Sequence, residues 1–161
     1  MSRFVLSLGT NLGDKSHNLG VAKHQISKQI GEISGESSVY KTAAWGNLTQ
    51  PEFYNQIIEG RTSLSPESLM SVILNIETDM GRLRTTKWSP RIIDIDILFY
   101  ESIVLDKPEL NIPHPMFHLR GFTLVPLAEL MPDFIDPRSG KSMNALLEEL
   151  NDELEVIKAY E

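Results

Sequence analysis

The chain has 161 residues, 41% of them hydrophobic and 23% charged, and its 15 Lys and Arg against 22 Asp and Glu give a net charge of −7. This is the composition of an ordinary globular protein. Because the chain has no cysteine, thiolate catalysis, disulfides, iron–sulfur clusters and Cys-based zinc sites are excluded, and we expect a cytoplasmic location. No apolar run approaches the length of a membrane span, and the acidic total disfavours nucleic acid, so we expect neither as a partner.

The first half of the chain alternates strand and helix signals. Apolar residues at every second position predict a strand over residues 4–8 that ends at Gly9. Apolar residues at helical spacing then predict a helix that continues to Gly31. Further strands are expected at residues 37–42 and 53–61.

The clearest helix begins after Ser65, which supplies a capping hydroxyl, and has Pro66 in its first turn. Gly81 is expected to end it. Its apolar face is formed by Leu69, Val72, Ile73, Ile76 and Met80.

The second half of the chain begins with the strongest predicted strand, at residues 92–100, followed by a turn at 101–102 and a hairpin partner at 103–105. After an irregular, proline-containing stretch come a short helix near 126–130, a helix at 142–150 and a final strand at 153–160. Because hairpin-length connections join several strands, we predict an α+β fold with a largely antiparallel sheet and helices packed on it.

Positive charge is concentrated in residues 82–91, which contain four Lys or Arg and no acidic residue. The rest of the chain therefore carries −7 − 4 = −11. A basic segment alone is more often a solvated loop than a binding site, but its neighbours favour an anion site here.

Asp94 and Asp96 lie in the strongest predicted strand. Side chains alternate between the faces of a strand, so both carboxylates point the same way, with Cα atoms about 6.5 Å apart, while Ile93, Ile95, Ile97 and Phe99 point to the core. Like charges on one face are unfavourable unless cations neutralise them. One interpretation of the two aspartates is the exposed polar face of an edge strand. The other is a Mg²⁺ site, because paired carboxylates on a rigid element suit two ions that clamp a phosphoryl transfer.

Two further patterns are weaker. Residues 9–16 follow a strand like a phosphate-binding loop, but they have three residues between the glycines instead of four, and Asp14 would repel phosphate. His114 and His118 have metal-ligand spacing for a helix, but the flanking prolines disfavour one, so we expect no zinc site. His114 and Arg120 are better interpreted as further contacts to an anion, with a structural histidine as the alternative.

Phe53 and Asn55 share one face of a predicted strand, and Tyr54 points to the other. An aromatic ring beside an amide suits a flat heterocycle, because the ring can stack on its face while the amide contacts its edge. Phe122 is a second candidate for stacking. A core phenylalanine beside a surface asparagine is the alternative interpretation.

Taken together, these motifs closely resemble the 6-hydroxymethyl-7,8-dihydropterin pyrophosphokinases of folate biosynthesis. The most specific part is Arg91-x-x-Asp94-Ile95-Asp96 with Pro90 before it. The similar segments are residues 8–14, 40–42, 50–56, 82–84, 87–98, 112–115 and 120–127. The resemblance implies a single pyrophosphokinase domain over residues 1–161, a ferredoxin-like fold, and transfer of pyrophosphate from ATP to the pterin hydroxyl with release of AMP.

The resemblance also implies roles for individual residues. The metal ligands for two Mg²⁺ ions would be Asp94 and Asp96, which with Arg82 and Arg91 form the catalytic set. The contacts to ATP, the co-substrate, would come from Arg82, Arg84, Trp88, Arg91, Ile97, His114 and Arg120. The pterin would be bound by Thr42, Trp45, Phe53, Asn55 and Phe122. We expect a monomer with small-molecule partners.

The residue types favour direct in-line attack by the substrate hydroxyl, because no Cys or Ser–His nucleophile motif is present. Asp96 or a water molecule could accept the proton. Two other functions are compatible with the motifs. A ferredoxin-like nucleotide sensor would bind ATP without forming AMP, and another two-metal nucleotidyltransferase would release pyrophosphate.

Overall fold

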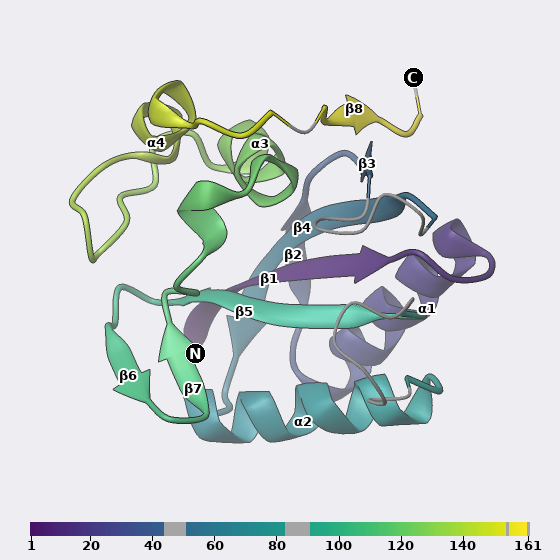
Figure 1. Cartoon of the computed structure of the whole chain (residues 1–161). Helices are drawn as coiled ribbons and strands as arrows, with labels where there is room; N and C mark the ends of the chain where they lie inside the picture. Colours follow the sequence, from purple (N-terminus) through teal and green to yellow (C-terminus); the bar gives the residue numbers. More distant parts are fainter. Residues whose placement is uncertain (44–50, 83–90, 154, 161) are drawn as a thin grey trace.

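The computed structural model describes residues 1–43, 51–82, 91–153 and 155–160 (Figure 1). The helices are α1 (Lys15–Gln29), α2 (Pro66–Asp79), α3 (Gly121–Leu130) and α4 (Met143–Glu149), with a 3-10 turn at Phe117–Leu119. The strands are β1 (Ser2–Thr10), β2 (Ile33–Glu36), β3 (Tyr40–Thr42), β4 (Phe53–Thr62), β5 (Asp94–Tyr100), β6 (Leu105–Lys107), β7 (Leu110–Ile112) and β8 (Ile157–Lys158). No helix in these described stretches is both long and apolar enough to cross a bilayer.

Side-chain caps begin three of these helices. Asp14 accepts a hydrogen bond from the amide of His17 at the start of α1, and Ser65 and Ser142 do the same for α2 and α4. These oxygens satisfy amides that have no partner within the helix. After α2, Gly81 has a φ of 91°, a left-handed conformation that glycine adopts without steric cost.

The main sheet is antiparallel in every described pairing and has the strand order β5-β1-β4-β3-β8, with β2 also paired to β4. This confirms the predicted α+β class. The long strand β1 lies between β4 and β5 and pairs with both of them.

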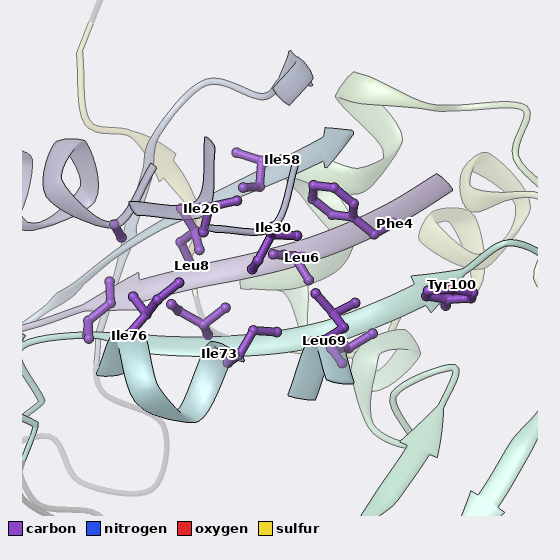
Figure 2. Packing of buried hydrophobic residues seen from close by; sticks show 14 of the residues in the cluster. Phe4, Leu6, Leu8, Ile26, Ile30, Ile58, Leu69, Ile73, Ile76 and Tyr100 are labelled. Carbon is purple, nitrogen blue, oxygen red and sulfur yellow. The ribbon is translucent and has the colours of Figure 1, made fainter. Parts of the chain in front are cut away.

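Helices cover both faces of this sheet (Figure 1). Figure 2 shows Leu69, Ile73 and Ile76 of α2 and Ile26 of α1 packed near Phe4, Leu6 and Leu8 of β1, and these residues belong to the larger hydrophobic cluster. A second cluster lies between the opposite face and α3 and α4, and it includes Val5, Ile57, Leu98, Leu124 and Leu127.

The second predicted strand, at residues 37–42, is wrong in its bounds. The structure instead has β2 at Ile33–Glu36 and β3 at Tyr40–Thr42. Ser37 interrupts the ladder between them, because its hydroxyl accepts from the Ile57 amide at 3.0 Å while its own amide donates to the Ile57 carbonyl. Ser37 thus binds both the amide and the carbonyl of Ile57 although it lies outside β2 and β3.

The predicted hairpin partner at residues 103–105 is also wrong. After a turn at Glu101, whose φ is 48°, the chain leaves β5. Leu105 pairs with Ile112 in the separate hairpin β6–β7, in the stretch predicted to be irregular. Ile103 and Leu105 pack on the larger hydrophobic cluster, so burial and not pairing with β5 directs this segment.

Two predicted elements near the C-terminus have different lengths. Helix α3 begins at Gly121 and not near Pro126. Its first amide donates to Asp152 Oδ2 at 2.8 Å, which provides a cap from the distant C-terminal segment. Strand β8 is confined to residues 157–158 instead of the predicted 153–160.

Candidate active site

A row of paired residues crosses the sheet on the face covered by α3. Asp94 of β5 is opposite Gly9 of β1, and Gly9 is opposite Asn55 of β4. Residues directly opposite each other point to the same face. The predicted metal-binding strand and the predicted heterocycle-binding strand therefore present their polar groups to one surface, about two strand spacings or 10 Å apart.

Because Gly9 has no side chain, the surface in the middle of this row is not raised by one. A Cβ atom added at Gly9 would lie 3.1 Å from Asn55 Oδ1 and 3.7 Å from Phe53 Cδ1. Both side chains thus lean over the glycine, which confirms that they share a face. Any larger residue at this position would displace the amide, so the close approach requires glycine.

Asp94 lies between two arginines. Its Oδ1 is 3.3 Å from Arg82 Nη1, and its Oδ2 is 3.4 Å from Arg91 Nη1. Arg82 also contacts Glu77 Oε2 at 3.0 Å. The basic segment and the aspartate strand therefore meet at their ends, as the sequence predicts, and the cations offset part of the repulsion between carboxylates.

The pKa of Asp96 is raised from its ordinary value of 3.8 to about 7. Burial is the main cause, and the negative charges of Asp94 and Glu77 add to it, against smaller opposing effects of Arg120 and Arg82. Asp96 retains partial solvent exposure, but protein surrounds its carboxylate closely. The charged form of Asp96 is therefore disfavoured in this surrounding, and a bound cation would relieve that cost.

Glu77 contributes a buried carboxylate at the end of α2 that the sequence motifs did not indicate. It is 2% exposed, and its Oε2 accepts from the Ile95 amide at 2.7 Å. A sequence signal was available, because Glu77 continues the apolar stripe of Leu69 and Ile73 at a spacing of four residues. An acidic residue at a core position needs a buried partner.

Arg91 is fixed by the loop that follows β1. The Arg91 amide donates to Asn11 Oδ1 at 2.7 Å, and the Asn11 amide donates to the Arg91 carbonyl at 3.0 Å. Asn11 Nδ2 also donates to the Pro51 carbonyl at 3.2 Å. Asn11 thus connects Arg91 to the segment that leads into β4. The sequence motifs did not indicate this role.

His114 and Arg120 belong to the same charged region. The pKa of His114 is lowered from 6.5 to about 4, first by burial and then by the positive charge of Arg120, while Asp94 opposes both. The Met116 amide donates to His114 Nδ1 at 3.1 Å. At neutral pH the imidazole is therefore uncharged, with Nδ1 an acceptor and Nε2 the donor. Any contact with an anion is a neutral hydrogen bond.

The predicted heterocycle site contains a buried hydrogen-bond donor that has no partner among the described residues. Asn55 is 4% exposed, and its Nδ2 has no hydrogen-bond partner in the described part of the chain. A buried donor of this kind is costly unless a ligand accepts from it. Thr42 is opposite Phe53 in the sheet, and Phe122 lies in the first turn of α3, where its ring is 5.6 Å from Arg120 Cζ.

The structure does not bring every predicted residue to this surface. The Ile97 side chain is 3% exposed within the larger hydrophobic cluster, so only its backbone is left for contact with a nucleotide. Trp45, Arg84 and Trp88 lie outside the described residues. Their predicted roles remain predictions.

The carboxylates could supply only some of the ligands of a magnesium ion. Within residues 1–43, 51–82, 91–153 and 155–160, no group of three or more His, Cys, Asp or Glu side chains could hold a metal ion alone. Mg²⁺ commonly uses only one or two carboxylates and takes its other ligands from water and substrate phosphates. The two carboxyl groups of Asp94 and Asp96, which point to one face of β5, match that donor set.

Comparison with known proteins agrees with this geometry. Residues 5–132 match the sequence model of the family described as 7,8-dihydro-6-hydroxymethylpterin-pyrophosphokinase (HPPK). The chain belongs to the HPPK family. An enzyme from Synechocystis named 2-amino-4-hydroxy-6-hydroxymethyldihydropteridine pyrophosphokinase is 42% identical over 91% of this chain and 75% of its own length. One of the same name from Methylorubrum extorquens is 40% identical over 84% of this chain and 86% of its own length.

Solved structures confirm the ferredoxin-like fold. A crystal structure of Plasmodium falciparum HPPK-DHPS wild type with pteroate has a TM-score of 0.75 and 19% sequence identity, covering 92% of this chain and 42% of that one. The chain thus spans less than half of that larger protein. Membership of the HPPK family confirms the predicted class of ATP-dependent pyrophosphokinase in folate biosynthesis, with small molecules as its substrates.

Proposed function

We propose that the chain, acting as one domain over residues 1–161, transfers the pyrophosphoryl group of ATP to the hydroxymethyl oxygen of 6-hydroxymethyl-7,8-dihydropterin and releases AMP. The transfer is a single in-line step assisted by two Mg²⁺ ions. The observation that carries the proposal is the row Asp94, Gly9, Asn55, because it presents a charged site and a heterocycle site on one face.

At the charged end, Asp94 and Asp96 would hold the magnesium ions. Bound there, Mg²⁺ would offset charge on the triphosphate and lower the pKa of the attacking hydroxyl. Arg91, fixed by Asn11, binds the triphosphate from a rigid position. Arg82 has a buried Nε with no partner among the described residues, so it has a donor left for a phosphate oxygen. His114 donates from Nε2 without adding charge.

At the other end, the Asn55 amide hydrogen-bonds the polar edge of the pterin, and Phe53 stacks on its ring. Phe122 covers the opposite face of the ring from the first turn of α3. Gly9 leaves space between the two ends, so the pterin hydroxymethyl group can extend toward the phosphates. Binding both substrates on one rigid sheet supplies the proximity that a direct transfer requires.

The reaction balances without an enzyme-bound intermediate. The hydroxyl oxygen forms a bond to the β-phosphorus of ATP, and the bond from that phosphorus to the oxygen shared with the α-phosphate breaks. AMP leaves with that oxygen, and the hydroxyl proton passes to Asp96 or to water. Arg82 and Arg91 stabilise charge on the transferring group, and bound Mg²⁺ would add to this.

The test is to incubate the protein with Mg-ATP and 6-hydroxymethyl-7,8-dihydropterin and to identify the nucleotide product by chromatography. AMP and the pterin pyrophosphate should form in equal amounts. Asp94→Asn should abolish most of the reaction, whereas Asp106→Asn, a control on an exposed aspartate paired with Arg138, should not. ATP binding without AMP would indicate a sensor, and release of free pyrophosphate would indicate nucleotidyl transfer. Either result would overturn the proposal.

A further inference from the structure

Glu77 occupies a position that stability alone does not favour. It is 2% exposed in the last turn of α2, in line with the core residues Leu69 and Ile73. Burying a carboxylate is costly, and a negative charge near the C-terminus of a helix also opposes the helix dipole. The other described acidic residue in that turn, Asp79, is exposed. The burial of Glu77 therefore has to be explained by the contacts that its carboxylate makes.

The first contact fixes the aspartate strand. Glu77 Oε2 accepts from the Ile95 amide at 2.7 Å, and Ile95 lies between Asp94 and Asp96. Strand β5 is at the edge of the main sheet, with β1 as its neighbour. An amide on an edge strand lacks a partner strand. The Glu77 carboxylate accepts from this amide instead of a neighbouring strand. It therefore fixes the backbone at Ile95, the one residue between Asp94 and Asp96.

The second contact is made by the same oxygen. Glu77 Oε2 is 3.0 Å from Arg82 Nη1, and that nitrogen is 3.3 Å from Asp94 Oδ1. The Arg82 side chain is only 12% exposed. One guanidinium nitrogen is thus shared between a carboxylate of the helix and a carboxylate of the strand. Because both attract it, loss of charge at Glu77 would let Arg82 move closer to Asp94.

We propose that Glu77 is a positioning residue for the metal site: it restrains Arg82 and the Ile95 amide through one oxygen, so that the Asp94 carboxylate stays available to a divalent cation. This inference rests on the proposed function, since it concerns the same site. Without the Glu77 charge, Mg²⁺ would have to displace a more tightly paired Arg82 from Asp94. The consequence is an increased requirement for magnesium and no change in the pterin site.

The main variant is Glu77→Gln, which keeps an oxygen that can accept from the Ile95 amide but removes the charge. The matched control is Glu67→Gln on the same helix. Glu67 is exposed and pairs with Lys107 at 2.9 Å, far from the site, so its loss tests the general effect of removing an acidic residue from α2. Thermal unfolding of both variants shows whether the fold persists.

The first readout is the Mg²⁺ concentration that gives half-maximal AMP formation at saturating ATP and pterin. Glu77→Gln should raise it about tenfold, within the range seen when groups behind a metal ligand are removed. Saturating Mg²⁺ should restore most of kcat, and the KM for pterin should stay within about twofold of wild type. Calorimetry with Mg²⁺ and a non-hydrolysable ATP analogue should show the same weakening without any turnover.

The second readout tests whether Glu77 acts through Arg82. In an Arg82→Ala background, adding Glu77→Gln should change the magnesium requirement by less than about twofold, because the group that it restrains is gone. An undiminished effect in that background would overturn the proposal, since it would indicate only a through-space loss of negative charge. An unchanged magnesium requirement in the single variant would overturn it too. Absence of AMP from the wild-type protein would instead refute the proposed function.

Discussion

Replacing Asp96 by asparagine should abolish most of the transfer activity and, at the same time, stabilise the metal-free protein. The activity falls because a neutral amide binds Mg²⁺ poorly. The stability rises because folding brings the Asp96 carboxylate out of water and close to the charges of Asp94 and Glu77, which raises its pKa to about 7. Asparagine has nearly the same shape without that charge.

The sign follows from proton binding. Between pH 4 and pH 7 the folded protein holds a proton on Asp96 that the unfolded chain has lost, so stability falls as pH rises through this range. The difference from 3.8 to about 7 is about three units, or about 4 kcal/mol at full strength. Because Asp96 retains some solvent contact, we expect about half of this, about 2 kcal/mol.

The assay is urea unfolding in EDTA at several pH values, with thermal unfolding in parallel. Above pH 7 the Asp96→Asn variant should be more stable than wild type by about 2 kcal/mol, or about 4–8 °C for a protein of this size. The difference should vanish near pH 4. Asp106→Asn is the control: the Arg138 guanidinium lowers the pKa of Asp106, so removing that charge should not stabilise the protein. Equal stability of Asp96→Asn and wild type at pH 8 would refute the reasoning, and near-normal turnover at saturating Mg²⁺ would refute Asp96 as a ligand.

The remaining predictions concern single positions. Gly9→Ala should raise the KM for pterin about tenfold, because the new methyl group crowds the amide over it; Gly20→Ala on α1, which meets no atom within 4 Å, should leave kinetics unchanged and stabilise the protein by about 1 kcal/mol in urea unfolding. The pKa of His114 is about 4 against an ordinary 6.5, so wild type should lose up to about 3 kcal/mol as pH falls from 6.5 to 4. In His114→Gln this loss should be absent, and an identical pH dependence would show that the histidine is not buried neutral. Asp152→Ala should remove the cap of α3, cost about 1 kcal/mol and weaken pterin binding in calorimetry more than binding of an ATP analogue.

The local part of the site could be predicted from sequence because it depends on one strand. The alternation of side chains places Asp94 and Asp96 on one face whatever the strand pairs with, and it does the same for Phe53 and Asn55. The register between strands is a tertiary property. That Gly9 lies between Asp94 and Asn55 follows from two separate pairings of β1, which no spacing along the chain encodes.

The errors have the same origin. Ile103 and Leu105 have the apolar pattern of a strand, and the structure partly buries them, but Leu105 pairs with Ile112 and not with β5. A pattern of apolar residues predicts which side chains are buried and does not specify the partner. Likewise, the start of α3 depends on Asp152, which lies 31 positions away from Gly121 in the chain.

The concentration of carboxylates around β5 is best understood as a cost that substrate binding offsets. Glu77, Asp94 and Asp96 come from two elements and converge where, among the described residues, Arg82, Arg91 and Arg120 bring positive charge. Burial and the neighbouring carboxylates raise the pKa of Asp96, so the arginines do not fully offset the cost of its charge. A site poised in this way gains most from a ligand that carries both cations and anions. A magnesium complex of a triphosphate has that composition: under the proposed function the cations would neutralise the carboxylates and the phosphates would neutralise the arginines, so neither group of residues would bind as well without the other.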